Sequence, residues 1–506
     1  MSGNSRVWHV HALDRFEQGS RQVTVIGAGI SGLVTAYELE RLGYRVEVLE
    51  GNTRIGGRIH THRFGNNPGA PSVELGAMRI PTHHRHTLEY IRRMGLGNKL
   101  RAFSTLMSEE NAFLHTAEGF IRIRDAAGPL RENFRRDLER HLPGHRHDHG
   151  TVVFGAWLTA IVDAIAPPDL REALREDLRR QLLDMVARVD LTEHLRGAAR
   201  DRVDLHSLFS AHPGLRAGCS SRLNSFLDDI LAETSPELLR LDGGMDQLTH
   251  RLAGLLHTPV ALGHRVTGID VRGDHVLVHV RAGGRTIVKR SDFVVCTVPF
   301  PLVRRMRLTG VDEDKLAVLR DVVYCPATKV AVHCREPFWR EGGIRGGASF
   351  TGGRIRQTYY PPADGAPGRG AALLASYTIG DEAARLGRMS ARRRHRIVLE
   401  ELSTVHPELM SPGMVLDVVS VAWGDHHPWA GGGCTTRWGK NAAEVEVERT
   451  RSARPAGRLF FAGEHCSTAP AWIEGAIESA LAAVEDVGRY EPAHRRAGRP
   501  DPAGAL

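Results

Sequence analysis

The N-terminal part of the chain contains the feature that most constrains its fold. An apolar, β-branched run beginning at Val23 leads into three glycines with G-x-G-x-x-G spacing, Gly27, Gly29 and Gly32. A helical pattern follows, then a second apolar run that ends in Glu50. This order predicts a βαβ unit that binds a dinucleotide. Gly27 allows the tight turn, Gly29 lets the backbone approach a pyrophosphate, and Gly32 lets helix and strand pack closely. Glu50 is placed to accept hydrogen bonds from ribose hydroxyls.

A second glycine pair follows Glu50, in the segment Arg54-Ile-Gly56-Gly57-Arg58. Gly57 would let the chain pass close to the cofactor, and the Arg58 guanidinium suits a bidentate contact with the pyrophosphate. The simpler interpretation is an ordinary turn with a solvated arginine. Nicotinamide-binding domains do not need such a segment, so its place directly after the βαβ unit favours a different dinucleotide.

Bulk properties exclude several classes of protein. The 506 residues suffice for two or three domains, and 42% apolar with 25% charged residues is typical of a globular protein. The net charge of +8 comes from scattered arginines rather than a basic block, so we expect no nucleic-acid partner. The six cysteines form no C-x-x-C pair, and the chain has no leader-like or membrane-length apolar run. These features predict a reduced, cytoplasmic protein that binds no membrane.

Periodicity gives a coarse map of the elements. Residues 105–235 have Leu, Arg, Asp and Glu at helical spacing and are expected to be helical. The histidine-rich segment 141–149 inside this region has a Pro-Gly pair and irregular spacing, so we interpret it as a solvated loop and predict no metal site. Strands are expected within 259–271, 276–280, 293–298, 324–338, 357–360, 371–377 and 458–464, with a helix at 472–487 and a disordered tail after Tyr490.

From about residue 21 to 488 the chain resembles the flavin amine oxidase superfamily, and within it the FAD-dependent L-amino-acid oxidases. The resemblance implies an α/β fold: a Rossmann-like FAD-binding domain of the glutathione-reductase/amine-oxidase type, a mixed-sheet substrate domain and a helical region. The implied domains are 21–62 with 240–303 and 455–488 for FAD, 63–104 with 304–454 for substrate, 105–239 for the helices, and tails at 1–20 and 489–506. Four motifs carry the resemblance: the fingerprint with Gly56-Gly57-Arg58, Glu74-Leu-Gly-Ala-Met-Arg79-Ile-Pro, Ala327-Thr-Lys329-Val, and Phe461-Ala-Gly463-Glu464-His with Trp472-Ile-Glu-Gly-Ala-Ile-Glu478.

The second motif is the one that indicates an amino acid as substrate. In the L-amino-acid oxidases the arginine matching Arg79 holds the substrate carboxylate, and a tyrosine matching Tyr377 shares this task. A guanidinium can hold a carboxylate through two parallel hydrogen bonds, whereas a simple amine would leave its charge unpaired. The alternatives are a structural salt bridge for Arg79 and a core position for Tyr377.

Two more residues complete the implied catalytic set. Lys329, in an apolar strand, resembles the lysine that holds a water against flavin N5; the alternative is a snorkelling surface lysine. Trp472 resembles an aromatic wall over the flavin; the alternative is a core tryptophan. The opposite wall of the aromatic cage found in larger amine oxidases is missing, because Thr435 follows Cys434. This departure weakens a monoamine oxidase interpretation.

The cofactor is expected to be FAD, held without a covalent bond. Gly463 and Glu464 would close a strand against a helix starting near Trp472, whose positive end favours anionic reduced flavin. Cys434 follows three glycines and resembles the cysteine that attaches FAD covalently in monoamine oxidases, so a covalent link is the alternative. The resemblance implies further cofactor contacts from Met78, Arg79, Val266, Trp472 and Ile473.

The expected reaction is oxidative deamination of an L-amino acid to the imino acid and then the 2-oxo acid, with ammonia and hydrogen peroxide as products. A flavin amine oxidase for a carboxylate-free amine, an enzyme that passes an imine (of tryptophan, for example) to a pathway partner, and a flavin-binding scaffold are the alternatives. No general base is assigned, because residues 225–229 lack the histidine found in some relatives. We expect a homodimer. Pocket walls are expected near Tyr359, Tyr360 and Trp423, with Arg216 and Asp228 as candidates for side-chain selection.

Overall fold

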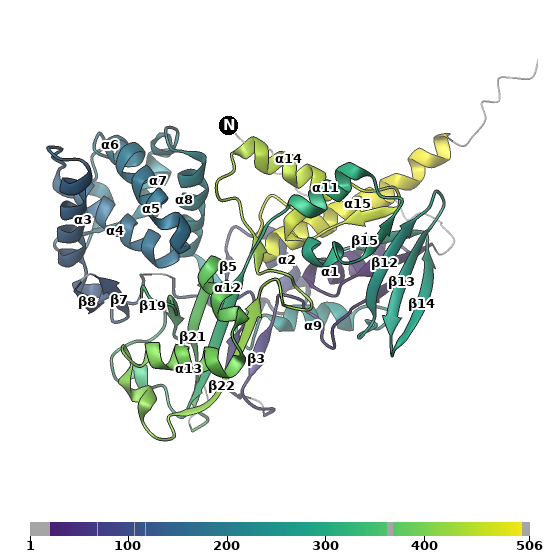
Figure 1. The fold of residues 1–506 in the computed structure, drawn as a ribbon, viewed down its shortest axis with the longest axis horizontal. Coiled ribbons are helices and arrows are strands. Elements are labelled where there is room, and N and C mark those ends of the chain that lie inside the picture. The colour runs from purple at the N-terminus through teal and green to yellow at the C-terminus, as the bar shows by residue number, and fades with distance from the viewer. Residues whose placement is uncertain (1–20, 68, 106, 117, 362–367, 498–506) are drawn as a thin grey trace, which may run out of the picture. The chain divides into compact units, whose positions relative to one another are not determined.

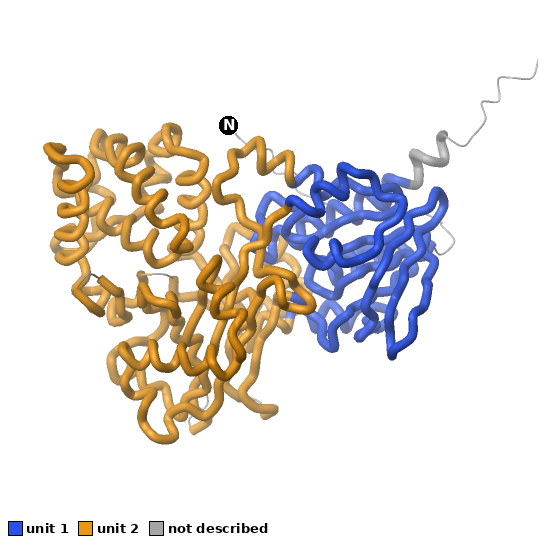
Figure 2. The backbone as a smooth tube through the Cα atoms, viewed as in Figure 1, with its two compact units in different colours: residues 1–57, 248–321, 449–506 blue, residues 58–247, 322–448 orange. Residues whose placement is uncertain are grey.

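The computed structural model describes residues 21–497, except 68, 106, 117 and 362–367 (Figure 1). The chain forms two compact units, each built from separated segments (Figure 2). Unit 1 comprises Met1–Gly57, Leu248–Asp321 and Arg449–Leu506, and unit 2 comprises Arg58–Gln247 and Val322–Glu448. These boundaries differ from the three domains expected from the sequence, since the helical region belongs to the same unit as the mixed sheet.

Unit 1 contains a parallel four-stranded sheet of order β2-β1-β15-β24. The βαβ unit predicted from the glycine motif supplies its first two strands. The strands are short and almost wholly buried, as expected when helices cover both faces of a parallel sheet. Helix α15 packs against α1. The bounds are β1 Gln22–Ile26, α1 Ile30–Arg41, β2 Arg45–Leu49, β15 Phe293–Cys296, β24 Leu459–Phe461 and α15 Ile473–Ala497.

A second, four-stranded sheet of unit 1 has the order β14-β13-β12-β16. Strand β14 is an exposed edge strand that the sequence analysis missed, because its mixed polar composition lacks a buried face. Helix α15 runs to Ala497, past Tyr490, where a disordered tail was expected. The remaining bounds are β12 Arg265–Val271, β13 Val276–Ala282, β14 Arg285–Ser291, α10 Phe300–Val303, β16 Arg307–Thr309 and α11 Glu313–Asp321. Helices α9 Asp246–Gly254 and α14 Ala442–Ala453 each begin in unit 2 and end in unit 1.

Unit 2 is built on a mixed seven-stranded sheet of order β22-β18-β21-β20-β19-β7-β8. Its two outer strands β7 and β8 form a hairpin within the stretch expected to be helical, so that expectation was wrong for residues 113–122. Each of these strands has only four residues, so its alternation of apolar and polar residues is too short to outweigh the helical pattern around it. The bounds are β7 Phe113–Thr116, β8 Gly119–Arg122, β18 Ala327–Cys334, β19 Ala348–Phe350, β20 Gln357–Tyr359, β21 Ala371–Ile379 and β22 Val415–Trp423.

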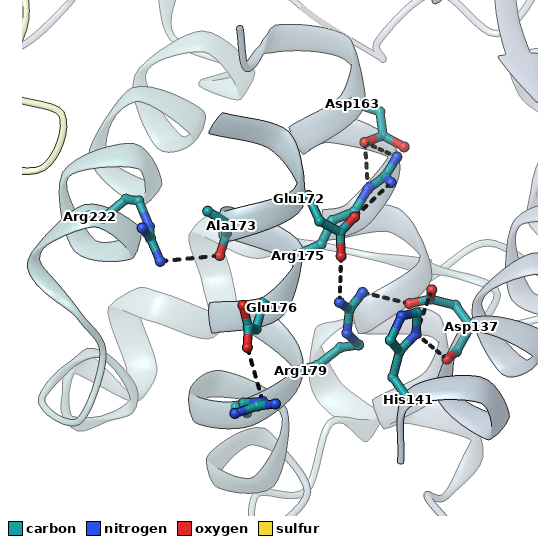
Figure 3. A network of polar contacts seen from close by, with 10 residues as sticks. Asp137, His141, Asp163, Glu172, Ala173, Arg175, Glu176, Arg179 and Arg222 are labelled. Atoms are coloured by element: carbon teal, nitrogen blue, oxygen red, sulfur yellow. Dashed lines mark hydrogen bonds and ion pairs between the residues drawn. The ribbon is translucent and has the colours of Figure 1, made fainter. Parts of the chain in front are cut away.

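The helical region of unit 2 is tied together by arginine ion pairs (Figure 3). Arg179, which is 5% exposed, donates to Asp137 at 2.9 Å and to Glu172 at 2.8 Å, and Arg175 donates to Asp163 at 2.6 Å. The Asp137 pair links α3 to the turn that follows α5, and the Asp163 pair links α4 to α5. The bounds are α3 Ala127–His141, α4 His149–Ile165, α5 Pro168–Asp177, a π-helical turn Leu178–Leu182, α6 Leu183–Val186, α7 Leu205–Ala211 and α8 Ser221–Thr234.

Small sheets connect this helical region to the rest of unit 2. The order β5-β11-β6 places the strand after α8 between two strands from the N-terminal half of the chain. The smaller elements are β3 Thr61–Arg63, β4 Ser72–Glu74, β5 Ile80–Pro81, α2 Arg85–Arg93, β6 Leu100–Ala102, β9 Leu195–Arg196, β10 Arg202–Val203, β11 Leu238–Leu241, β17 Tyr324–Cys325, α12 Gly380–Arg388, α13 Ala391–Leu402 and β23 Cys434–Thr435.

Two features are absent from the part of the chain that the structure describes. No helix among them is long and apolar enough to cross a membrane. Within the same residues, no three His, Cys, Asp or Glu side chains are grouped so that they could hold a metal ion. The histidine-rich segment joins the end of α3 to the start of α4, where Asp148 caps α4 by accepting from the backbone N–H of Thr151.

Candidate active site

The fingerprint glycines of unit 1 differ in what prevents a side chain at each position. Gly27 has φ of +102°, a conformation that L side chains rarely adopt. A Cβ on Gly32 would lie 1.9 Å from the carbonyl oxygen of Gly27, so the close packing of helix and strand requires glycine there. At Gly29, the N-cap of α1, the atom nearest to an added Cβ would be the Cα of Gly57, 4.0 Å away. The bare backbone at Gly29 therefore leaves space at a helix N-terminus, where an anionic group binds well.

The second glycine pair lies directly against this loop. The Gly56 N–H donates to the carbonyl of Ala28 at 2.8 Å, and a Cβ on Gly57 would lie 3.3 Å from the Cα of Gly29. Both glycines of the pair have positive φ, +97° and +55°. Two chain segments without side chains thus meet at the N-terminus of α1.

Glu50 lies at the end of β2, across from the glycine loop. Its carboxylate accepts the backbone N–H groups of Ala28 and Asn52, each at 2.8 Å. These two contacts fix the carboxylate beside the loop and leave lone pairs for ribose hydroxyls. The helix N-terminus, the bare glycine loops and the fixed acid together fit the dinucleotide part of FAD.

The C-terminal segment of unit 1 brings three predicted residues to the start of α15. The buried Glu464 accepts the backbone N–H of Ala471 at 3.1 Å, and Ala471 has φ of +68°, a rare conformation for a residue other than glycine. Trp472 follows this turn, partly exposed, and Ile473 begins the helix. Glu464 therefore stabilises the strained turn that positions Trp472.

Lys329 is buried in unit 2, on strand β18. Its side chain is not at the surface, which excludes the snorkelling alternative: Nζ donates to the carbonyl of Gly76 at 2.7 Å and lies 3.4 Å from the sulfur of Met78. Burial, together with the nearby charge of Arg79, lowers the pKa of Lys329 to about 7, against the opposing charges of Glu74 and Glu233. At neutral pH this amine is therefore divided between its protonated and neutral forms.

Glu74 is a buried acid of this site that was not singled out in the sequence, although it opens the second motif. Burial raises the pKa of Glu74 to about 7, against the hydrogen bonds that its carboxylate accepts. These come from the backbone N–H of Met245 at 2.8 Å and from Thr61 Oγ1 at 2.9 Å. The Glu74 carbonyl also accepts from Lys329 Nζ at 3.3 Å.

Arg79 is 8% exposed and is paired with a carboxylate from its own chain. Its two terminal nitrogens donate to the two carboxylate oxygens of Glu233. Nη1 also donates to the Tyr359 hydroxyl at 3.3 Å, and the guanidinium lies 6.0 Å and 5.9 Å from the ring centroids of Phe103 and Tyr359. Burial alone would lower the pKa of Arg79, but the Glu233 charge outweighs it and raises the pKa. Arg79 was a candidate from its sequence motif, whereas Glu233 was not.

Tyr377 lies beside both cations. It pairs with Lys329 across β18 and β21, and Lys329 Nζ lies 4.7 Å from its ring centroid. Its ring centroid is 6.4 Å from that of Tyr359. Burial raises the pKa of Tyr377, so its hydroxyl stays protonated and can donate. The structure therefore brings Arg79, Lys329 and Tyr377 together and adds Tyr359 to them.

A second acid lies one helical turn before Glu233. Asp229 accepts a hydrogen bond from the indole N–H of Trp438 at 2.5 Å. Burial raises the pKa of Asp229 to about 7, the Trp438 hydrogen bond lowers it, and the Glu233 charge raises it. Two carboxylates thus follow one face of α8 toward Arg79.

Other residues expected near the pocket have different partners. Arg216 and Asp228 pair with each other at 2.8 Å, and the Asp228 side chain is 60% exposed. The Tyr360 hydroxyl bonds to Ser349 and His406, at 2.7 Å and 2.6 Å. The Trp423 indole donates to the carbonyl of Leu75 at 2.7 Å.

The remaining predicted cofactor contacts are distributed over both units. In unit 1, Val266 is buried in β12. In unit 2, Arg58 Nη1 donates to the carbonyl of Gly433 at 3.0 Å. Cys434 lies in β23, opposite Cys325 of β17. Non-covalent binding of FAD, with a covalent link through Cys434 as the alternative, stays a prediction.

Comparisons with known proteins agree on one family. The sequence profile described as flavin containing amine oxidoreductase matches residues 30–488. The flavin-dependent L-tryptophan oxidase RebO of Lentzea aerocolonigenes is 56% identical over 475 residues, covering 93% of this chain and 98% of that protein. An L-amino-acid oxidase of Vipera ammodytes ammodytes is 29% identical, covering 93% of each. Cyclohexylamine oxidase from Brevibacterium oxydans IH-35A shares the fold, with a TM-score of 0.63 at 20% identity, over 94% of this chain and 100% of that chain.

Proposed function

The chain belongs to the family of flavin-containing amine oxidoreductases, and we propose that it is an FAD-dependent L-amino-acid oxidase. The reaction converts an L-amino acid and O2 into the imino acid and hydrogen peroxide, and water then converts the imino acid into the 2-oxo acid and ammonia. The observation that carries the proposal is the buried Arg79 guanidinium, which already holds a carboxylate through both terminal nitrogens. A 56% identical relative named an L-tryptophan oxidase supports the same class of substrate.

In this proposal the cofactor is held mainly by backbone. The glycine loops at Gly29 and Gly57 accommodate the pyrophosphate at the N-terminus of α1, and Glu50 accepts from the ribose. Arg58, Met78, Val266, Gly463, Glu464, Trp472 and Ile473 are proposed as further contacts. A flavin bound there would supply the redox chemistry, with the substrate oxidised at Cα and O2 reduced to hydrogen peroxide.

The substrate is oriented by unit 2. Arg79 donates two parallel hydrogen bonds to the α-carboxylate, and the protonated hydroxyls of Tyr359 and Tyr377 are placed to donate beside it. Holding the carboxylate at two oxygens fixes the direction of the Cα–H bond, which is how positioning lowers a barrier. The aromatic faces of Phe103 and Tyr359 exclude water from the guanidinium and strengthen its hydrogen bonds.

Lys329 is proposed to hold a water molecule and to exchange a proton with it at Nζ. Because burial lowers the pKa of Lys329 to about 7, both its protonated and its neutral forms are populated at neutral pH, and Nζ can donate to this water or accept from it. The carbonyl of Gly76 and the sulfur of Met78 fix the position of Nζ. No side chain is assigned as general base for the substrate, since the neutral amine needs none.

L-Tryptophan is the substrate we propose to test first, because the 56% identical relative is named for it. The three aromatic rings around Arg79 and Lys329, those of Phe103, Tyr359 and Tyr377, are compatible with an aromatic side chain.

We further propose a homodimer in the cytoplasm. Light scattering on the purified protein tests the dimer. An oxidase that passes its imine to a pathway partner would carry out the same first step.

One observation favours a second candidate, an oxidase of a carboxylate-free amine. Glu233 already neutralises Arg79, so Arg79 needs no substrate carboxylate to be electrostatically satisfied. In that case Arg79 would be structural. A peroxide-coupled oxygen-consumption screen of the purified holoenzyme separates the two candidates. It would include the L-amino acids, several D-isomers and simple amines. Peroxide from L-amino acids supports the proposal, and peroxide from amines alone contradicts it.

A further inference from the structure

Glu233 binds the two terminal nitrogens of Arg79 that, in the proposed function, hold the substrate carboxylate. Each guanidinium nitrogen that would donate to a substrate oxygen donates here to an oxygen of Glu233. We propose that Glu233 is an internal competitor of the substrate: an incoming carboxylate displaces it from Arg79, so Glu233 sets the affinity of the clamp for carboxylates. This inference rests on the proposed function of Arg79.

The fold fixes Glu233 at this place. Glu233 is in the last turn of α8, and a short connection leads from the helix into β11. Strand β11 pairs with β5, which begins directly after Arg79, and the register places Leu239 opposite Ile80. The backbones that carry the two partners are therefore joined by sheet hydrogen bonds within unit 2. The pairing follows from topology rather than from a chance contact of two long side chains.

Electrostatics make Glu233 the partner that can leave. Its carboxylate lies near the C-terminus of α8, where the helix dipole disfavours negative charge, and Asp229 carries a second acid one turn earlier. The Glu233 side chain is 20% exposed, whereas that of Arg79 is 7% exposed. The Arg79 guanidinium also lies 6.0 Å and 5.9 Å from the ring centroids of Phe103 and Tyr359. Glu233 thus has a path toward solvent, and the guanidinium is held in place.

The Glu233 carboxylate neutralises Arg79 while no substrate is bound. A buried guanidinium without a counter-charge would destabilise the fold, and Glu233 removes this cost before substrate arrives. A substrate carboxylate replaces it one for one, so the clamp stays electrically balanced. An amine without a carboxylate has no group that can replace Glu233 and leaves the pair closed. Displacing Glu233 therefore lowers the affinity for carboxylates and leaves that for such amines unchanged, so the preference for a carboxylate comes from Arg79 itself.

The test compares ligands with and without a carboxylate on Glu233→Gln holoenzyme. The amide keeps the size of the side chain and removes its charge. We expect indole-3-propionate, an aromatic carboxylate without the amine, to bind about tenfold more tightly than to wild type in calorimetric titration. The KM for L-tryptophan should fall, with kcat changed by less than about twofold. Tryptamine, which has the amine and no carboxylate, should bind as weakly as before.

Three results would overturn the inference. Indole-3-propionate could bind Glu233→Gln no more tightly than wild type at equal FAD content. Tryptamine could gain as much affinity as the carboxylate, which would make Glu233 a steric obstacle only. The KM for L-tryptophan could rise, which would make Glu233 a partner of the substrate ammonium.

Two further variants keep the test decisive. Asp228→Asn removes a carboxylate from the same helix at an exposed position paired with Arg216, and it should leave all three affinities unchanged. Glu233→Asp keeps the charge on a shorter side chain and should give a smaller gain for indole-3-propionate; it replaces Glu233→Gln if that variant does not fold. Because binding is measured without turnover, a wild-type enzyme that oxidises no amino acid would contradict the proposed function and leave the displacement testable.

Discussion

The two units recognise their proposed ligands by different physical means. In unit 1 the cofactor cradle consists of backbone: bare glycine loops, a helix N-terminus and a carboxylate fixed by two N–H groups. In unit 2 the clamp consists of buried charged and aromatic side chains. A backbone cradle is complete without its ligand, whereas a buried cation needs a counter-charge at all times. The clamp therefore contains an internal carboxylate and the cradle does not need one.

The largest expected effect tests the backbone character of the cradle. Gly32→Ala places a Cβ 1.9 Å from the Gly27 carbonyl oxygen, so the turn and helix must move apart. We expect a loss of roughly 3 kcal/mol in the free energy of unfolding and no bound FAD. Thermal unfolding of the apoprotein and the flavin absorbance measure both quantities.

Gly29→Ala is the matched control, because the same added methyl group meets no protein atom closer than 4.0 Å. The apoprotein should unfold near the wild-type temperature, while FAD affinity falls. Equal destabilisation by both substitutions would show that Gly29 serves packing rather than the cofactor.

The next effect concerns the clamp. Arg79→Met removes both donors to the carboxylate and leaves Glu233 without its partner. We expect KM for the amino acid to rise about a thousandfold, with FAD still bound. Steady-state kinetics with a flavin absorbance check measure this. Arg216→Met, which removes a cation outside the clamp, is the control, and an unchanged KM in Arg79→Met would disprove the assignment.

Lys329→Met tests the other buried cation of unit 2. Since Lys329 is proposed to hold a water and exchange its proton, we expect flavin reoxidation by O2 to slow about a hundredfold. Anaerobic reduction by substrate should change much less. Stopped-flow measurement of each half-reaction separates the two steps. Reduction slowed as strongly as reoxidation would assign Lys329 to substrate binding instead.

The last effect is a pH dependence of stability. Burial raises the pKa of Asp229 to about 7, so the folded protein binds a proton that the unfolded chain has released. The free energy of unfolding of the wild type, relative to that of Asp229→Asn, should therefore decline as pH rises from the usual aspartate pKa to about 7. Above pH 7 the difference between the two proteins should stay constant. Thermal unfolding between these pH values tests it, with Asp228→Asn as control. A difference that does not change with pH would contradict the burial of a protonated Asp229.

The contrast between the units also explains what could be predicted from the sequence. The cradle residues lie within a few tens of positions, and their identity as glycine is itself the signal, so the βαβ unit was predicted with its strands and helix. Arg79 and Lys329 were found through short motifs. Glu233 was not, because an acid in an amphipathic helix looks solvated until the β5–β11 pairing brings it to Arg79. The hairpin β7–β8 and the edge strand β14 were missed because short or exposed strands leave little periodic signal.

In the proposed function, the clamp of unit 2 selects substrates that carry a carboxylate beside the amine to be oxidised. The most direct measurement is anaerobic reduction of the holoenzyme flavin by L-tryptophan and by tryptamine, which differ only in the carboxylate. The account predicts fast loss of oxidised-flavin absorbance with L-tryptophan or another L-amino acid, and none with tryptamine. Reduction by tryptamine at a comparable rate would contradict it and make the Arg79–Glu233 pair a structural salt bridge.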